Sequence, residues 1–159
     1  MTTKLNNISA FHPATIMATW FWSGLSPKAP GTLGSLAALP FGYGIYMLGG
    51  QVYLMEAIVV VFLLGILVTH IYCKKTGRTD PGEVVIDEVA GQWIPLLIAG
   101  TSPLLYLLAF VFFRIFDIWK PWPIGWMDKN IKGALGVMVD DIAAGVLALG
   151  ALALIKQVI

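Results

Sequence analysis

Carboxylates gather in the stretch from Arg114 to Asp141, and their types indicate metal chemistry. The chain has ten basic and nine acidic residues, and eight of these charged residues lie in this stretch. Long apolar segments lie on either side of it. Asp140 and Asp141 are adjacent and lie inside an apolar run that is long enough to cross a bilayer. An ionisable side chain at such a position is functional by default. We therefore take the two aspartates as the first candidates for chemistry.

A second acidic group lies around the start of the apolar segment 84–100. It consists of Asp80, Glu83, Asp87 and Glu88. Carboxylates without a nearby thiol or histidine cage are what a hard divalent cation prefers, and Mg²⁺ takes one or two of them together with water and phosphate oxygens. Lysine and arginine side chains beside such a site would offer positive charge to the same phosphate. These residue types favour an enzyme that acts on a phospholipid headgroup.

Two other classes of protein fit the same residue types. Acidic residues in a first helical turn are also explained by the helix dipole, and a network of ion pairs would join helices without any catalysis. Intramembrane carboxylates also mark the ion and proton paths of transporters. A small ion-coupled or proton-coupled transporter and a structural subunit therefore remain as alternatives.

The loop SPKAPGTLGS (26–35) could supply part of a phosphate site. Its two prolines and two glycines predict that no helix begins before about Leu33. Lys28, Thr32 and Ser35 would then stand near a helix N-terminus, whose free N–H groups attract anions. A loop of this composition before an apolar helix is more often only a connection.

The composition predicts an all-α integral membrane protein with one domain, residues 1–159. Hydrophobic residues make up 58% of the chain and charged residues 12%, about half the charged share of a soluble domain. Apolar runs predict about five transmembrane helices, and the aromatic segment 11–25 predicts a further helix lying in the membrane interface. Prolines 121 and 123 predict an irregular segment that extends to residue 132. The five predicted spans cover residues 33–50, 52–73, 84–100, 104–119 and 133–155.

Charge along the chain predicts how these spans are oriented. Lys74, Lys75 and Arg78 directly follow the second span, so the positive-inside rule places their loop in the cytoplasm. With Glu56 and Lys156 as exceptions, every ionisable residue then falls on or near the cytoplasmic face. A net charge of +1 without a basic face excludes nucleic acid as a partner. No feature of the sequence calls for an obligate protein partner.

The chain contains four separated motifs, namely KAPGTLGS (28–35), TGRTDPGEVVIDEVAG (76–91), FRIFDIWKPWPIGWMDKNIKG (113–133) and GVMVDDIAAG (136–145). They resemble the motifs of the phosphatidylglycerophosphatase A family of bacterial lipid phosphatases, in the family's order and spacing. The resemblance covers roughly residues 15 to 155.

The resemblance implies Mg²⁺-dependent removal of the phosphate monoester from phosphatidylglycerophosphate, which yields phosphatidylglycerol and inorganic phosphate in glycerophospholipid biosynthesis. It also implies a multi-pass protein of the bacterial inner membrane, with the lipid bilayer and the lipid substrate as partners. We expect the active site to face the cytoplasm.

The residues themselves suggest a role for each member of this site. The predicted metal ligands are Glu88, Asp117, Asp140 and Asp141, and the predicted catalytic residues are Asp80, as a base, and Asp87, which is also a candidate ligand. The predicted substrate-binding residues are Lys28, Thr32, Ser35, Arg114 and Lys120. The nucleophile is left open between a water activated beside the metal and an aspartate that forms a phospho-enzyme.

Overall fold

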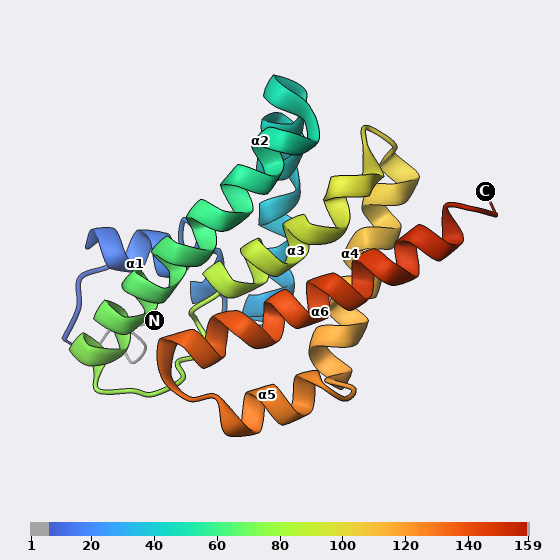
Figure 1. The fold of residues 1–159 in the computed structure, drawn as a ribbon. Coiled ribbons are helices and arrows are strands. Elements are labelled where there is room, and N and C mark those ends of the chain that lie inside the picture. The colour runs from blue at the N-terminus through green and yellow to red at the C-terminus, as the bar shows by residue number, and fades with distance from the viewer. Residues whose placement is uncertain (1–6, 159) are drawn as a thin grey trace.

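A computed structural model describes residues 7–158, and these residues form helices joined by short connections (Figure 1). Within that range no strand is present, so the prediction of an all-α fold is confirmed. The elements in chain order are α1 (Pro13–Ala18), the short 3₁₀ helix η1 (Ser23–Leu25), α2 (Pro30–Thr76), α3 (Ile86–Ala99), α4 (Pro103–Trp119), α5 (Ile124–Asn130) and α6 (Gly133–Ile155).

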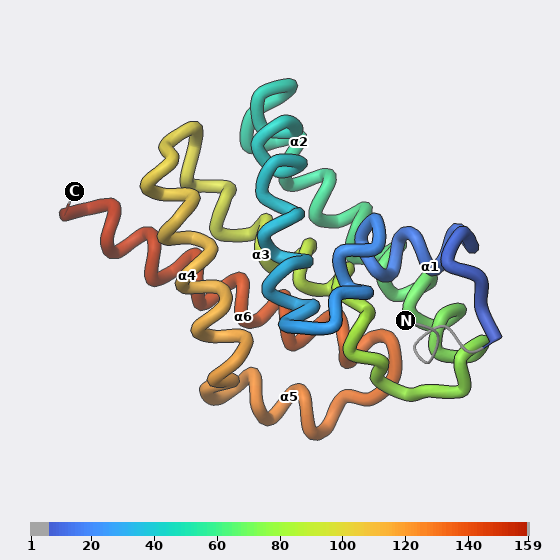
Figure 2. Tube along the Cα trace, turned by 180° about the vertical axis from the view of Figure 1, so that it is seen from behind, coloured from blue at the N-terminus to red at the C-terminus, as the bar shows by residue number. Residues whose placement is uncertain are grey.

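Helix α2 consists of two arms rather than one straight rod. Its backbone leaves the helical region at Gly49 and Gly50, and Gly50 has φ of 65° and ψ of −151°, a conformation that essentially only glycine adopts. The chain rises through the first arm, turns at these glycines and returns through the second (Figures 1 and 2). The two arms correspond to the predicted segments 33–50 and 52–73.

The start of α2 differs from the sequence-based expectation. We expected the prolines and glycines of the loop to prevent helix before about Leu33, but the helix begins at Pro30. Proline is well tolerated at the first helical position, because the N–H group that it lacks has no partner within the helix there. The expected boundary was therefore wrong by three residues.

Helix α5 is a second departure, because residues 121–132 were predicted to be irregular. Pro121 and Pro123 precede the helix instead of interrupting it, and Ile124 N donates to the Pro121 carbonyl oxygen at 2.8 Å. Lys120 ends α4 with φ of 47°, and α5 then packs against α6 (Figure 1). This return brings Asp128 back to the end of α4.

The predicted N-terminal helix is shorter than expected. Helix α1 has only six residues, and beyond its C-cap residue Thr19 the residues Trp20, Phe21 and Trp22 all have positive φ, which no helix continues through. The His12 side chain caps α1 by accepting a hydrogen bond from Ala14 N at 3.1 Å. The aromatic segment is thus a short helix followed by a left-handed turn.

Within residues 7–158, two helices are long and apolar enough to cross a membrane, namely α2 and α6, with 47 and 23 residues. With 14 and 17 residues, α3 and α4 reach only about 21 and 26 Å at ~1.5 Å per residue, less than the ~30 Å hydrocarbon core. The helices thus favour a membrane location, and the count of about five spans stays a prediction.

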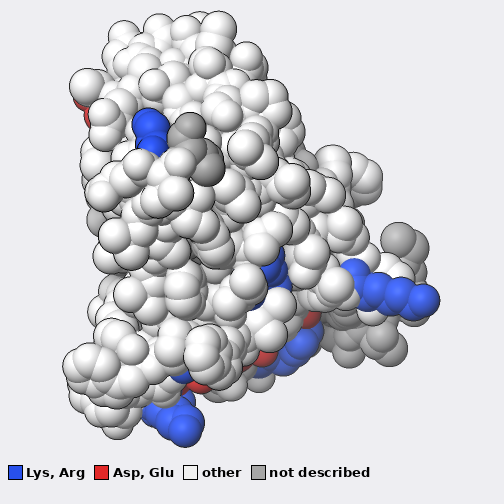
Figure 3. All heavy atoms as spheres, turned by 90° about the vertical axis from the view of Figure 1, so that its right-hand side faces the viewer, with Lys and Arg blue, Asp and Glu red and all other residues white. Residues whose placement is uncertain are grey.

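The surface of the molecule fits a lipid environment. Large apolar side chains are exposed along its sides, among them Leu48 at 80%, Leu63 at 60% and Ile118 at 70%. On the face drawn in Figure 3, most Lys, Arg, Asp and Glu atoms lie toward one end, and uncharged residues cover most of the rest. Broad exposed apolar surfaces of this kind mark contact with a membrane or another protein.

Helix α3 is the centre of the fold, since it packs against α2, α4 and α6 and most of its residues are buried. Two glycines let it approach α6 closely. A Cβ at Gly145 would lie 2.3 Å from the Gly91 carbonyl oxygen, and a Cβ at Gly91 would lie 2.5 Å from the Asp141 carbonyl oxygen. This close backbone contact sets the acidic start of α3 beside the acidic part of α6.

Substituting Gly145→Ala should therefore destabilise the protein by about 1–3 kcal/mol, because the added methyl group has to push α3 away from α6. Thermal unfolding in detergent micelles measures this change. Gly150→Ala in the same helix is the matched control, since no atom lies within 4 Å of its Cβ position. Equal unfolding temperatures for the two variants would contradict the close contact.

Candidate active site

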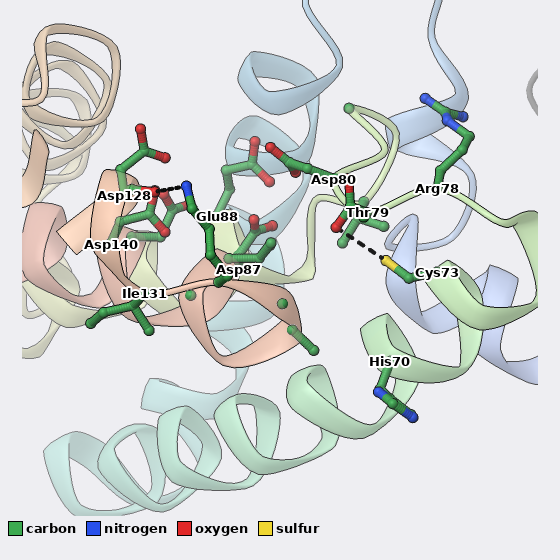
Figure 4. A pocket seen from close by; sticks show the side chains of 18 of the residues that line it. His70, Cys73, Arg78, Thr79, Asp80, Asp87, Glu88, Asp128, Ile131 and Asp140 are labelled. Atoms are coloured by element: carbon green, nitrogen blue, oxygen red, sulfur yellow. Dashed lines mark hydrogen bonds between the residues drawn. The ribbon is translucent and has the colours of Figure 1, made fainter.

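A cavity of about 790 Å³ lies among the end of α2, the following loop, the start of α3, the end of α4, and the α5 and α6 region. Its wall carries both signs of charge. The acidic residues of the wall are Asp80, Asp87, Glu88, Asp117, Asp128, Asp140 and Asp141, and the basic ones are Lys74, Arg78, Lys120 and Lys132. Part of this wall is drawn in Figure 4.

Three carboxylates of the cavity form a cluster that we call the acid trio: Asp87, Glu88 and Asp141. One oxygen from each lies within 4.8 Å of those from the other two. Asp87 and Glu88 stand in the first turn of α3, whereas Asp141 comes from α6, and the contact at Gly91 brings the two helices together. Asp87 is 8% exposed and Asp141 is 4% exposed.

Each member of the acid trio has one buried oxygen without a hydrogen-bond partner among the described residues: Asp87 Oδ1, Glu88 Oε2 and Asp141 Oδ2. None of the three carboxylates forms a salt bridge within residues 7–158. Like charges this close repel one another, and burial removes the water that would screen them. Only carboxylate oxygens meet here, so the donor set fits a hard divalent cation such as Mg²⁺.

Lys120 lies beside the acid trio between two further carboxylates. Its Nζ is 2.5 Å from Asp140 Oδ2 and 2.8 Å from Asp128 Oδ1. Burial opposes the charge of Lys120, but the hydrogen bonds with Asp128 and Asp140 outweigh burial and raise its pKa above the ordinary value. The hydrogen bond from Lys120 in turn lowers the pKa of Asp128. Lys120 is therefore an ammonium at neutral pH.

Arg114 and Asp117 form an ion pair on α4 at 2.6 Å, but only one of them borders the cavity. Asp117 lines the cavity, whereas Arg114 is not among the described residues of its wall, and 14% of the Arg114 side chain is exposed. Arg114 also donates to Ser35 Oγ at 3.4 Å. A Cβ at Gly31 would lie 2.2 Å from Glu88 Oε1 and 3.3 Å from an Arg114 nitrogen, so the first turn of α2 packs tightly on both.

The predicted phosphate loop does not reach the cavity as the structure describes it. Lys28 is exposed and Thr32 half-buried, and neither is among the described residues of the wall. Ser35 is fully buried, and its hydroxyl donates to the Gly31 carbonyl oxygen at 2.9 Å. Their role in binding phosphate stays a prediction, as does that of Arg114.

The structure thus brings together seven of the eleven predicted site residues on one wall: Asp80, Asp87, Glu88, Asp117, Lys120, Asp140 and Asp141. Asp140 and Asp141, although adjacent in sequence, both border the cavity, as expected. Asp80 is exposed on the loop before α3 and lies between Arg78 and Glu88 in the view of Figure 4. The assignment of Asp80 and Asp87 as catalytic residues stays a prediction.

Four charged residues of this wall are not among the predicted site residues: Lys74, Arg78, Asp128 and Lys132. The contact of Asp128 with Lys120 depends on α5 folding back, which the sequence does not show. Arg78 lines the cavity and pairs with Glu83. The one sequence signal for this pair was their spacing of five residues within the motif 76–91.

An all-helical, membrane-associated chain whose cavity combines an acid trio with a fixed ammonium has the features of a membrane phosphohydrolase. The comparison with known families identifies it more narrowly. The chain belongs to the phosphatidylglycerophosphatase A family, whose family model matches residues 16–156. The predicted family resemblance is thereby confirmed.

Individual relatives agree with this assignment. The chain is 44% identical over 142 residues to phosphatidylglycerophosphatase A of Escherichia coli K12, covering 89% of this chain and 82% of the relative. It is 38% identical to phosphatidylglycerophosphatase A of Haemophilus influenzae, over 91% of this chain and 89% of that protein. It is also 38% identical to a putative phosphatidylinositol-3-phosphatase of Bacteroides thetaiotaomicron, over 91% of this chain and 94% of that protein. No solved structure matches the chain.

Proposed function

We propose that this chain hydrolyses phosphatidylglycerophosphate to phosphatidylglycerol and inorganic phosphate. Its family and its relatives are named for this phosphatase activity. The structural observation that carries the proposal is the acid trio, in which one oxygen from each of three carboxylates lies within 4.8 Å of the other two. Each member also has one buried oxygen without a partner among the described residues, and Lys120 lines the same cavity.

Asp87, Glu88 and Asp141 would hold Mg²⁺ in this proposal. The bound ion would supply positive charge that stabilises the oxygens of the phosphoryl group during transfer. Asp117 and Asp140 are the outer members of the same acidic wall. Each also pairs with a basic residue, but Asp140 Oδ1 has no partner among the described residues and is available to the site.

Lys120 would contact the phosphate directly. An ammonium has three N–H donors, and the hydrogen bonds to Asp128 and Asp140 use two of them. The third donor is left for a phosphoryl oxygen, and the two carboxylates hold it in a fixed direction before the substrate binds. Such preorganisation is what makes a charged donor effective in stabilising a transition state.

Asp80 is proposed as the general base. It is exposed on a loop at the wall of the cavity, so it is in contact with water and can accept a proton from an incoming nucleophile. Asp87 is the candidate for an aspartyl nucleophile, and a water molecule is the alternative.

The test uses purified protein in mixed micelles with phosphatidylglycerophosphate. Inorganic phosphate should be released with Mg²⁺ present, and EDTA should stop the release. Parallel assays with phosphatidylinositol 3-phosphate address the second activity named among the relatives. A folded protein that releases no phosphate in a metal-dependent way would overturn the proposal, and ion flux through reconstituted vesicles would then favour a transporter.

We further propose that five segments cross the bacterial inner membrane, with the cavity facing the cytoplasm. The segments are the two arms of α2 together with α3, α4 and α6. Basic residues at the cavity end support this orientation under the positive-inside rule, namely Lys74, Lys75, Arg78 and Lys132. The bilayer would have to thin locally around α3 and α4, at a modest cost.

Cysteine labelling tests this topology in a Cys73→Ser background. We expect a membrane-impermeant maleimide added to intact spheroplasts to label Thr101→Cys and to leave Gly82→Cys unlabelled, since both positions are exposed but lie at opposite ends of α3. Lysis of the cells should expose Gly82→Cys to the reagent. The reverse labelling pattern would overturn the orientation.

A further inference from the structure

A second charged group, Arg78 with Glu83, stands on the cavity wall apart from the acid trio and has no part in the reaction proposed above. Arg78 lines the cavity, and its NH1 nitrogen is 2.5 Å from Glu83 Oε1. Glu83 is 1% exposed, and the Tyr72 hydroxyl donates to the same oxygen at 3.0 Å. The guanidinium is thus held at one side by a buried carboxylate, which is itself held by a tyrosine.

An ion pair that only held together the loop between α2 and α3 would not need an open guanidinium. The side chain of Arg78 is 43% exposed, in contrast to its partner, and it borders the cavity. A guanidinium carries five N–H donors in a planar fork that matches the oxygens of a phosphate. The contact with Glu83 occupies one end of this fork, which leaves the remaining donors for an anion.

The distribution of charge divides the cavity into two parts. The acid trio favours a cation, whereas Arg78 and the neighbouring Lys74 favour an anion. In the view of Figure 4, Asp80 lies between Arg78 and Glu88. A volume of about 790 Å³ is far larger than a single phosphate group requires and lies in the range of cavities that hold whole small molecules.

We propose that Arg78, positioned by Glu83, binds the phosphodiester of the lipid headgroup while the acid trio and Lys120 engage the terminal phosphomonoester. This inference rests on the proposed function and defines the substrate class as phospholipids that carry a phosphomonoester in addition to their phosphodiester. Phosphatidylglycerophosphate and phosphatidylinositol 3-phosphate both belong to this class. Phosphatidic acid does not, because its only phosphate is a monoester on the diacylglycerol.

Arg78→Gln is the central variant of the test, with kcat/KM measured in mixed micelles. For phosphatidylglycerophosphate it should fall roughly 10- to 100-fold, the effect of losing a charge-assisted bidentate contact, mostly through KM. For phosphatidic acid it should change less than twofold. Inhibition gives an independent readout: phosphatidylglycerol, which has only the diester, should inhibit the variant at least about tenfold more weakly, with inhibition by inorganic phosphate unchanged.

Further variants separate binding from folding. Arg78→Lys keeps the charge and should recover part of the lost affinity. Combining Arg78→Gln with Glu83→Gln removes the buried charge that the single variant leaves unpaired, so it should restore the unfolding temperature without restoring selectivity. Lys75→Gln is the matched control, since Lys75 is exposed in the same basic turn but does not belong to the described wall of the cavity.

Two results for Arg78→Gln would overturn this inference: kcat/KM and inhibition that fall equally for both lipids and both inhibitors, or no fall in either quantity. In both cases, activity of the wild-type protein would still support the proposed function. If neither wild type nor variant hydrolyses phosphatidic acid, the two inhibitors decide. A wild-type protein inert toward every lipid would overturn the proposed function and this inference together.

Discussion

Replacing Asp141 with asparagine should lower Mg²⁺-dependent phosphate release on the order of 10³-fold, since the stabilisation supplied by a catalytic metal amounts to several kcal/mol. Asp141 is 4% exposed and contributes one of the three clustered oxygens. Asparagine keeps the size of the side chain but removes its negative charge, so the remaining pair should bind Mg²⁺ more weakly. Phosphate release from phosphatidylglycerophosphate, measured against Mg²⁺ concentration, gives both the rate and the affinity.

Thermal unfolding distinguishes loss of the metal from loss of the fold. Without Mg²⁺, Asp141→Asn should be at least as stable as wild type, because it removes one of several buried like charges. Added Mg²⁺ should raise the unfolding temperature of wild type more than that of the variant, since a ligand stabilises the folded state in proportion to how tightly it binds. Glu56→Gln, an exposed position on α2, should keep wild-type activity. Wild-type rates in Asp141→Asn would remove this residue from the metal site.

The sequence was most informative where a physical rule acts locally. The predicted segment 133–155 coincides with α6, and 104–119 differs from α4 by one residue, because glycine, proline and hydrophobic length mark helix ends without reference to the rest of the fold. The acidic wall was predicted for the same reason. A carboxylate within an apolar run, such as Asp140, is costly wherever the run folds, so its position alone signals a site.

Features that depend on packing between helices could not be predicted from the sequence. Prolines 121 and 123 looked like helix breakers, and nothing local shows that a helix starts directly after them and returns along α6. The Lys120 to Asp128 pair follows from that return. Arg114 donates to Ser35 Oγ of α2, a contact between segments far apart in sequence, and its role in binding phosphate stays a prediction.

In the loop 26–35, local sequence indicates a helix start, but packing determines which residues this helix start contacts. A helix does begin there, at Pro30, as an anion site at a helix N-terminus requires. At Gly31, the start of the helix lies against the side chains of Glu88 and Arg114. The Ser35 hydroxyl bonds the carbonyl oxygen one turn back in its own helix, a common alternative for serine inside helices. Local sequence therefore indicated a helix start in this loop but not what that helix start would contact.

Lys120→Met should lower kcat roughly 10²- to 10³-fold, comparable to the loss of one preorganised donor to a transition-state oxygen. The substitution keeps a long apolar stem but removes the ammonium, and it also leaves Asp140 buried without its partner. KM should change less than kcat if the third donor of Lys120 engages the phosphoryl oxygens mainly in the transition state. Lys129→Met is the control, because Lys129 is exposed on α5 and lies outside the described wall of the cavity.

The pH dependence separates the charge of Lys120 from its packing. Because the pKa of Lys120 is raised, its charge is present at neutral pH and is lost only as pH rises through that elevated value. Asp128→Asn removes one of the two carboxylates that raise this pKa, so the alkaline limb of the pH–kcat profile should move to lower pH, with activity retained near neutrality. An alkaline limb that stays in place in Asp128→Asn, together with wild-type kcat in Lys120→Met, would show that the ammonium does not act on the phosphate.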